Sequence, residues 1–341
     1  MKIFLFKGSL KIVEKSGVGK AIHHQQKAME ENNIAYTSNK KDYYDIIQLN
    51  TIFPDSVFAA IIAKIRGKKV VYYGHSTMED FKNSFKGSNF FAPIFKKWIM
   101  LCYSLGDVII TPTEYSKRLL SAYGIKKPIY ALSNGIDLSY FRPSPEGAKR
   151  FREKYKLKPS EKVVISVGHY IERKGISDFI KLAKRMPHVN FIWFGYTNLK
   201  LVPSYIQKAI AEAPKNVIFP GYISADELRD AYSGSDLFLF LTHEETEGIV
   251  LLEALAMKIS VLVRDIPIYS DDFSDGKELY KASTLDEFQD KIEKIIDGSL
   301  PSLEDKAYEI VKKKDIKAIG DKLQDIYASI NKSYESVDLK L

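Results

Sequence analysis

Short apolar runs alternate with helical stretches twice along the 341 residues of this chain, and this alternation limits the folds that the chain can adopt. The first series extends from residues 2–6 to residues 107–111, and the second extends from residues 162–168 to residues 260–263. Strands that alternate with helices at this spacing predict parallel sheets that are covered by helices on both faces. We therefore predict an α/β protein with two doubly wound, Rossmann-like domains that face each other across a cleft.

A polar segment that contains Pro143, Pro145 and Pro159 separates the two series. We expect a first domain over residues 1–140, a linker over 141–160 and a second domain over 161–317, followed by a helical tail over 318–341. Ligands bind at the carboxyl ends of parallel strands, so the cleft is the expected position of a site.

Positive charge is concentrated in the first half. Residues 1–140 hold 20 Lys and Arg against 11 Asp and Glu, whereas the remainder holds 31 against 32. This asymmetry indicates an anionic partner for the first half, either nucleic acid or an anionic membrane surface. No RNP-like, Cys/His or helix-turn-helix pattern accompanies the charge, which argues against nucleic acid.

Several classes of protein do not fit the sequence. The apolar runs are too short to span a bilayer, and residues 1–6 are too short for the core of a signal peptide, which predicts a cytoplasmic protein. The single cysteine, Cys102, cannot form an internal disulfide, and no Cys/His cluster has the spacing of a metal site. We therefore predict neither a metal nor another cofactor.

Two glutamates frame a Gly-containing turn between a strand expected at residues 236–242 and a helix. Glu245 lies in the turn, and Glu253 follows eight residues later in the helix, where it could accept hydrogen bonds from the hydroxyls of a ribose. A helix that begins near Gly248 would direct the free amides of Gly248, Ile249 and Val250 into the cleft, where they suit a phosphate.

Three further features follow expected strands. Gly17 belongs to a Gly-containing loop, residues 15–19, that opens a helix and suits a phosphate or a sugar, although a plain turn explains the loop equally well. His75 follows the strand expected at residues 69–73. Arg173 and Lys174 follow the first strand of the second series, and together a guanidinium and an ammonium suit a diphosphate.

This combination resembles the retaining glycosyltransferases of family 4, which have the two-domain GT-B fold. The resemblance rests on the spacing of Glu245 and Glu253, on the Arg-Lys pair 72 residues before Glu245, on His75 and on the turn at residues 134–135. It implies that His75 and Glu245 are catalytic residues at the transferred sugar, that Glu253 holds the ribose, and that the last helix crosses back to the first domain. The diphosphate would be neutralised without a metal. The implied donor-binding residues are Gly17, Arg173, Lys174, Thr246, Gly248, Ile249, Val250 and Glu253.

Thr246 and Glu247 stand where many members of that family have Gly and an aromatic residue, and the loop before Gly17 has one glycine fewer than is usual there. These departures leave the shape of the sugar pocket open. A glycoside hydrolase would also use two carboxylates, but it would not need the Arg-Lys pair.

The resemblance implies a hexosyltransferase that uses a UDP-sugar. Residues 6–10, 15–21 and 244–250, together with the basic first half, resemble the bacterial enzymes that add a second hexose to a monoglycosyl-diacylglycerol. We expect glucose to be transferred to this glycolipid acceptor, which gives diglucosyl-diacylglycerol. Galactose remains an alternative sugar, and a soluble or polyprenyl-linked saccharide remains an alternative acceptor.

Residues 81–100 combine lysines with aromatic side chains, a mixture that suits a membrane interface. Gly87 and Pro93 are expected to prevent one continuous helix. A core-facing helix with lysines at its rim fits the periodicity equally well. The membrane hypothesis predicts a peripheral protein at the cytoplasmic face of the cell membrane, bound to anionic lipid by Lys82, Lys86, Phe90, Phe91, Lys96, Lys97 and Trp98.

Overall fold

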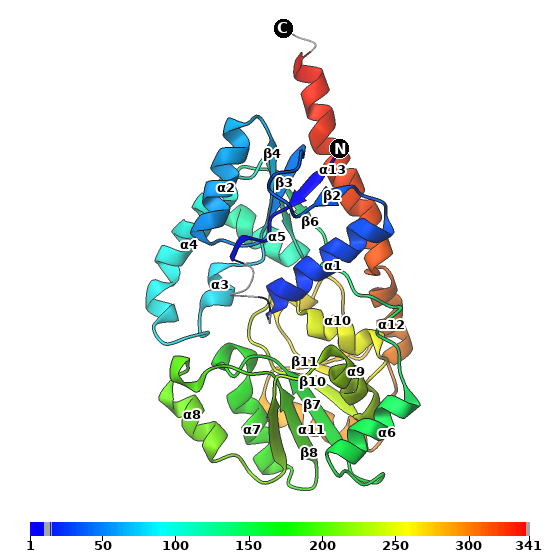
Figure 1. The fold of residues 1–341 in the computed structure, drawn as a ribbon. Helices are drawn as coiled ribbons and strands as arrows, with labels where there is room; N and C mark the ends of the chain where they lie inside the picture. The colour runs from blue at the N-terminus through cyan, green and yellow to red at the C-terminus, as the bar shows by residue number, and fades with distance from the viewer. Residues whose placement is uncertain (10–13, 15, 339–341) are drawn as a thin grey trace.

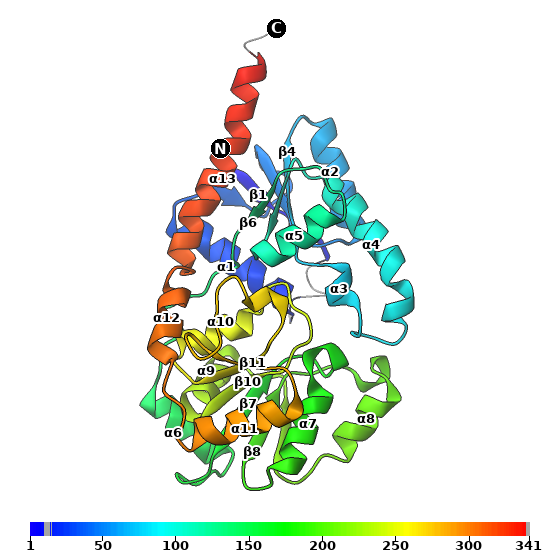
Figure 2. The ribbon, with the colours of Figure 1, turned by 180° about the vertical axis from the view of Figure 1, so that it is seen from behind.

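The computed structural model describes residues 1–9, 14 and 16–338, with side chains up to residue 330. Two six-stranded sheets lie one above the other, each covered by helices (Figures 1 and 2). Neighbouring strands are parallel in both sheets. The predicted α/β fold with two doubly wound domains is therefore confirmed.

The first domain contains the sheet β2-β1-β3-β4-β5-β6. Its apolar strands are buried on both faces, as expected for a parallel sheet between helices. The strands are β1 (Ile3–Leu5), β2 (Tyr36–Thr37), β3 (Ile46–Leu49), β4 (Lys69–Tyr73), β5 (Val108–Thr111) and β6 (Ile129–Ala131). The helices are α1 (Gly17–Glu31), α2 (Pro54–Ile65), α3 (Met78–Phe81), α4 (Ser88–Ser104) and α5 (Glu114–Ala122).

The second domain contains the sheet β12-β11-β10-β7-β8-β9, again with an apolar cluster on each face. The strands are β7 (Val163–Val167), β8 (Asn190–Phe194), β9 (Val217–Gly221), β10 (Leu237–Phe240), β11 (Val261–Arg264) and β12 (Tyr280–Ala282). The α-helices are α6 (Pro145–Lys154), α7 (Ile176–Arg185), α8 (Ser204–Ala211), α9 (Ala225–Gly234), α10 (Ile249–Ala256), α11 (Leu285–Ile296) and α12 (Glu304–Lys312), and the 3-10 helices are η2 (Glu172–Lys174), η3 (Leu199–Leu201) and η4 (Pro267–Tyr269).

The last helix, α13 (Ile316–Asp338), packs on the first domain although it follows the second in sequence (Figure 1). It lies against α1, and its side chains Leu323 and Tyr327 are fully buried in the core on that face of the first sheet. The Tyr327 hydroxyl donates a hydrogen bond to Gln48 of β3. The final residues of the predicted tail, 339–341, lie outside the described residues.

Residues 81–100 do not form one continuous helix, as expected, because α3 ends at Phe81 and α4 begins at Ser88; only the expectation for Pro93 is wrong. Gly87 has a left-handed backbone (φ +80°) and precedes the helix, but Pro93 lies inside it without ending it. A proline removes one hydrogen bond within a helix and crowds the preceding turn. The helix continues because Ala92, Ile99 and Tyr103 are buried against the first domain, and packing of this kind supplies most of the stability of a helix in a protein.

Two predicted membrane contacts also need correction. Trp98 faces the domain rather than the solvent, because its indole N–H donates to the carbonyl oxygen of Ile52 (2.8 Å) and its ring packs against the core. The Lys96 ammonium lies over the ring of Tyr123, 4.4 Å from the ring centre. By contrast, Phe90 and Phe91 are 79% and 52% exposed.

Candidate active site

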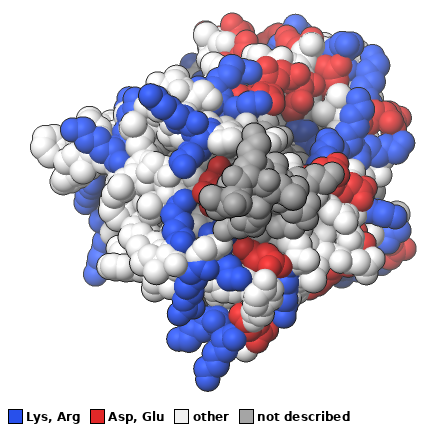
Figure 3. Space-filling view, turned by 90° about the horizontal axis from the view of Figure 1, so that it is seen from above, with Lys and Arg blue, Asp and Glu red and all other residues white. Residues whose placement is uncertain are grey.

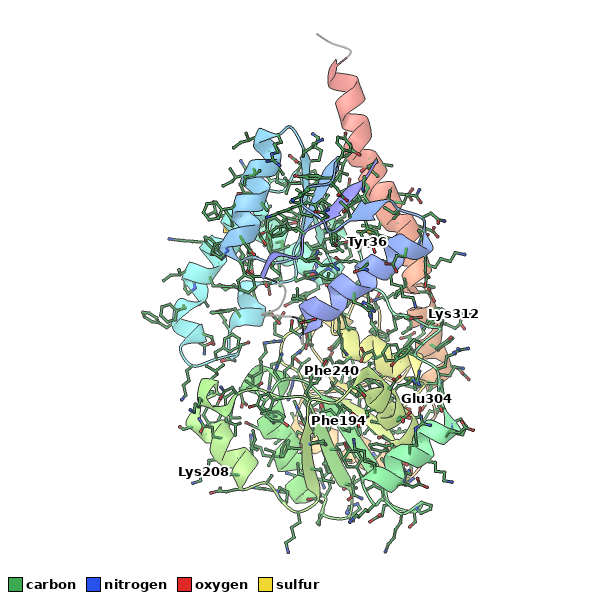
Figure 4. All side chains as sticks on the ribbon, viewed as in Figure 1. Tyr36, Phe194, Lys208, Phe240, Glu304 and Lys312 are labelled. Atoms are coloured by element: carbon green, nitrogen blue, oxygen red, sulfur yellow. The ribbon has the colours of Figure 1, made fainter. Side chains whose placement is uncertain are left out.

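A cavity of about 410 Å³ lies between the carboxyl ends of the two sheets. From the first domain it is lined by the start of α1 and by the loop after β4, and from the second domain by the loops after β7, β8, β9 and β10. Phe194 and Phe240, labelled in Figure 4, end two strands beneath this space. The predicted catalytic and donor-binding residues line the cavity, except Glu253, which lies beneath its surface.

The loop after β10 leads into α10 through Gly248. This residue has a left-handed backbone (φ +85°), and a β-carbon there would approach the Phe240 ring to 3.0 Å, so both the turn and the space favour glycine. The helix then begins with Ile249 and Val250, which line the cavity together with Gly248. Amides in the first turn of a helix lack intrahelical acceptors, so this end of α10 is suited to an anion.

Lys174 and Glu245 form an ion pair within the cavity. Burial tends to raise the pKa of Glu245, but Lys174 and Arg173 more than offset this effect and lower it. Burial lowers the pKa of Lys174, although Glu245 opposes the change. Glu245 is therefore held as a buried carboxylate beside a cation.

Arg173 joins the two domains and is only 8% exposed. Its Nη1 lies 2.8 Å from a carboxylate oxygen of Asp80 in α3 and donates to the carbonyl oxygen of Glu244 (2.8 Å). Its Nε donates to the hydroxyl of Ser84 in the first domain (3.0 Å). The guanidinium thus already has partners from both domains at the edge of the cavity.

His75 is a buried, neutral imidazole. Burial lowers its pKa to about 4, so the ring carries no charge near neutral pH. Its Nε2 lies 3.0 Å from the side-chain oxygen of Asn50, and its ring stacks on Tyr73. When Nε2 donates to Asn50, Nδ1 keeps a lone pair that can accept a hydrogen bond from a hydroxyl.

Glu253 is 1% exposed and lies in α10. One carboxylate oxygen lies 2.7 Å from the ammonium nitrogen of Lys20 in α1, and the other accepts a hydrogen bond from the Tyr232 hydroxyl (3.1 Å). Lys20 itself lines the cavity. The carboxylate that the sequence assigned to a ribose is therefore paired with a cation of the opposite domain.

Three site residues were not singled out from the sequence as functional. Asp80 lies five residues after His75 and lines the cavity, and burial raises its pKa although Arg173 partly offsets the effect. Glu247 accepts hydrogen bonds from Ser133 and Asn134 across the domain boundary. Lys20 is paired with a residue 233 positions away. Each of the three lies close to a residue that the sequence did single out, namely His75, Glu245 or Gly17, but no local pattern showed its partner.

Lys15 and Leu10, which belong to the sequence motifs, lie outside the described residues. Among the residues that are described, no group of three or more His, Cys, Asp or Glu side chains is arranged to hold a metal ion.

Two family models match the chain. The model described as glycosyl transferases group 1 matches residues 148–325, and the model described as glycosyltransferase family 4 matches residues 36–140. Together they cover the second sheet, the first sheet except β1, and the cavity loops that follow β4, β7, β8, β9 and β10, but not the start of α1.

Individual proteins match as well. The chain is 41% identical over 334 residues to the processive diacylglycerol alpha-glucosyltransferase of Acholeplasma laidlawii, an alignment that covers 97% of this chain and 99% of that protein. It is 26% identical over 244 residues to the alpha-galactosylglucosyldiacylglycerol synthase of Streptococcus pneumoniae, covering 70% of this chain and 65% of that protein.

Solved structures share the fold. The Anabaena protein HepE, solved in complex with UDP and glucose, superposes with a TM-score of 0.79 at 16% identity, over 96% of this chain and all of that chain. Its complex with UDP-glucose gives a TM-score of 0.75 with the same coverage.

Proposed function

Since the chain belongs to the glycosyltransferases of group 1 and family 4, we propose that it transfers a glucosyl residue from UDP-glucose to a diacylglycerol-based lipid and retains the configuration at the anomeric carbon. The observation that carries this proposal is the 41% identity to a diacylglycerol glucosyltransferase over 97% of the chain. The names of both glycolipid-synthesising relatives specify alpha linkages. Because the sugar of UDP-glucose is also alpha-linked, an alpha product requires retention.

The residues around the cavity have the chemistry that this reaction needs. In the transfer, the bond between the anomeric carbon and the diphosphate oxygen breaks, the acceptor oxygen bonds to the same face, and the hydroxyl proton leaves with UDP. Arg173, Lys174 and the first residues of α10 line the cavity, which supports the proposal that they stabilise the departing diphosphate. Glu245 is an ionised carboxylate, and His75 is a neutral hydrogen-bonding group, which suits contacts with sugar hydroxyls.

The acceptor is a lipid in this proposal, and monoglucosyl-diacylglycerol is the species that we expect to receive the sugar. The relative from Acholeplasma is named as processive, which for this chain would mean that diacylglycerol receives successive glucoses. Galactose as the transferred sugar and a soluble or polyprenyl-linked acceptor are outcomes that the experiment below separates.

The outer face of α2 supports contact with a membrane. Phe58, Ile61, Ile62 and Ile65 recur at helical spacing and are 65%, 40%, 46% and 80% exposed. The inward face carries the small residues Ser56, Ala60 and Ala63. A surface helix in water has the opposite arrangement, with large apolar residues inside and small or polar residues outside. A lipid surface would cover these side chains, and we propose that it does so.

Helix α4 extends this apolar face, and we name the exposed residues of both helices the α2–α4 face. The two helices lie along the same side of the first domain (Figures 1 and 2). Viewed from above, this side, on the left of Figure 3, presents mainly uncharged surface bordered by Lys and Arg. Segments 56–78 and 81–106 contain no Asp or Glu, which suits an anionic lipid surface. The face comprises Phe58, Ile61, Ile62, Ile65, Phe90, Phe91, Ile94 and Leu101.

None of the described helices is long and apolar enough to cross a membrane. We propose a peripheral position at the cytoplasmic face of the cell membrane, in which the exposed lysines Lys82, Lys86 and Lys97 attract anionic lipid to the α2–α4 face. Trp98 and Lys96 face the domain and are not part of this surface.

The test is a panel of donors and acceptors. The protein is incubated with UDP-glucose or UDP-galactose and with vesicles that contain diacylglycerol or monoglucosyl-diacylglycerol, and the lipids are analysed by mass and by the anomeric NMR signal. We expect an alpha-linked glucose on the lipid, and none with a Glu245→Gln control. A beta-linked product, or activity on soluble saccharides with none on lipid, would overturn the proposal. A galactolipid in place of the glucolipid would correct the donor.

A further inference from the structure

Lys20 is a cation of the first domain that reaches into the donor site of the second. It lies in the first turn of α1, lines the cavity, and places its ammonium nitrogen 2.7 Å from a carboxylate oxygen of Glu253. The Lys20 side chain is 34% exposed, whereas the Glu253 side chain is 1% exposed. The lysine can therefore move without losing much packing, and the glutamate cannot.

The other cations of the site are paired differently. Lys174 is paired with Glu245 of its own domain, and Arg173 lies between Asp80, Ser84 and the carbonyl oxygen of Glu244. Arg173 and Lys174 are both less than 15% exposed at the side chain, so each is confined. Lys20 has the most exposed side chain of these three residues, and the rotatable bonds of its four-carbon stem allow the ammonium group to change position.

Two helix starts face the same cavity from opposite domains. Gly17 and Val18 of α1 line it on one side, and Gly248 and Ile249 at the start of α10 line it on the other. Lys20 is one turn or less from the start of α1. A diphosphate that binds at the start of α10 would therefore come within reach of the Lys20 ammonium, and a doubly charged anion is a stronger partner for it than one carboxylate.

Glu253 would not be left without partners. On the proposed function, the ribose of the donor brings two hydroxyl groups that donate to this carboxylate, while Tyr232 keeps its hydrogen bond to the other oxygen. The cost of burying an unpaired carboxylate is thereby avoided. The exchange replaces one ion pair between protein groups with one ion pair to the ligand.

We propose that Lys20 is a donor-binding residue: the ribose takes over Glu253, and Lys20 turns to the diphosphate, so that the first domain binds the phosphates directly. This inference rests on the proposed function and adds to it a cation that belongs to neither the Arg-Lys pair nor the start of α10. Before a nucleotide binds, the ion pair with Glu253 holds the Lys20 ammonium beside the site.

The test compares UDP with uridine, which shares the base and ribose but lacks phosphate. Dissociation constants are measured by calorimetry for the wild type, Lys20→Met and Lys20→Arg. We expect Lys20→Met to weaken the binding of UDP at least about 10-fold, the usual cost of a lost charge-assisted contact. Uridine should bind to this variant as tightly as it binds to the wild type, or more tightly. Lys20→Arg retains the cation and should restore most of the affinity for UDP.

Lys27→Met is the matched control. Lys27 lies two turns further along α1 and forms an ion pair with Asp137, but it does not line the cavity. This variant removes an equivalent charge from the same helix and should change neither affinity. If both variants are less stable than the wild type but only Lys20→Met binds UDP more weakly, lost stability does not explain the weaker binding.

Three results would overturn the inference. Tighter binding of both ligands by Lys20→Met would mean that Lys20 only competes with the ribose. Equal weakening of both would mean that Lys20 only positions Glu253. Unchanged binding of UDP would mean that the phosphates do not contact Lys20. A wild type that binds no UDP would instead contradict the proposed function, which keeps the two failures distinct.

Discussion

The carboxylate of Glu247 accepts hydrogen bonds from both the backbone N–H (3.0 Å) and the side-chain amide (2.8 Å) of Asn134. Glu247 belongs to the loop that lines the donor site, and Asn134 belongs to the segment that follows β6 in the first domain. Both residues are buried, and the Ser133 hydroxyl also donates to this carboxylate. These hydrogen bonds therefore join the loop at the donor site to the segment that begins the connection between the domains.

We expect Glu247→Ala to destabilise the protein by about 2–4 kcal/mol, because it leaves buried donors of Ser133 and Asn134 without an acceptor. Denaturant unfolding of Glu247→Ala, Asn134→Ala and the double variant measures the coupling between them. The loss in free energy of unfolding for the double variant should be smaller than the sum of the two single losses, by at least about 1 kcal/mol. Additive effects would show that the two side chains do not interact in solution.

The cations and the glutamate at the donor site should determine nucleotide affinity. We expect Arg173→Ala, Lys174→Ala and Glu253→Ala each to weaken UDP binding by about 1–3 kcal/mol, since each removes a contact that involves a charged group. Calorimetric titration measures the affinities. Arg185→Ala is the control, because Arg185 pairs with the exposed Asp286 on the second domain and does not line the cavity. Wild-type affinity in all three site variants would remove the basis of the assignment.

Glu245 and His75 should affect turnover more than nucleotide affinity. We expect Glu245→Gln to lower kcat about 100-fold or more, because a preorganised charge at the sugar stabilises the charge that develops in the transition state. Affinity for UDP should not fall, since Lys174 loses a partner that competes with phosphate. His75→Ala should lower kcat as well. Steady-state kinetics with folded variants decides, and an unchanged kcat would exclude the assigned role of that residue.

Glu244 should make stability depend on pH around neutrality. Burial raises the pKa of its carboxyl to about 7, with Asp80, Glu79 and Glu245 nearby, although the Tyr115 hydroxyl opposes the shift. The folded state thus holds a proton that the unfolded state releases at a lower pH, so this contribution is complete below the ordinary glutamate pKa and is lost as the pH rises through 7. We expect the Tm of the wild type to fall relative to Glu244→Gln between about pH 5 and about pH 8. The same comparison for exposed Glu212→Gln should be flat, and a flat result for Glu244 would contradict the prediction.

The α2–α4 face should determine binding to lipid. We expect Ile62→Ser with Ile65→Ser, or Lys82→Gln, Lys86→Gln and Lys97→Gln together, to reduce sedimentation with anionic vesicles strongly, because each exposed lysine contributes about 1 kcal/mol at such a surface. High salt should weaken the wild type in the same way. Replacement of the exposed Lys149, Lys184 and Lys208 of the second domain by Gln makes an equal charge change and should have little effect. Equal loss in both lysine variants would indicate net charge rather than this face.

The regular part of the fold was accessible from the sequence because apolar runs of buried parallel strands are continuous and are separated by helices. The helix that was expected to follow from the loop at residues 15–19 is α1. The strands β2, β6 and β12 were not predicted; each is an edge strand of two or three residues, whereas the equally short β1 lies inside its sheet and was indicated by the apolar run at residues 2–6. The expectation that Pro93 interrupts the helix considered only its local effect on the backbone, whereas the packing of α4 against the domain keeps the helix continuous.

The candidate site was accessible only where its residues form local motifs. Glu245, Gly248 and Glu253 lie within nine residues, so this short segment alone is enough to indicate a helix start that suits a phosphate. Asp80 and Lys20 pair with residues 93 and 233 positions away, and no local pattern encodes such pairs. The outward apolar face of α2 was missed for a related reason, since periodicity reveals an apolar stripe but not whether the protein or a lipid covers it.

The position of α13 has a consequence for how the protein is made. The strands of the first domain leave the ribosome first, yet Leu323 and Tyr327, which complete one side of their core, are synthesised after the whole second domain. During translation the N-terminal half therefore exposes apolar surface that its own sequence cannot cover. The domain that is started first is completed last, so the synthesis of α13, rather than the emergence of the first six strands, sets the moment at which the N-terminal half reaches its full stability.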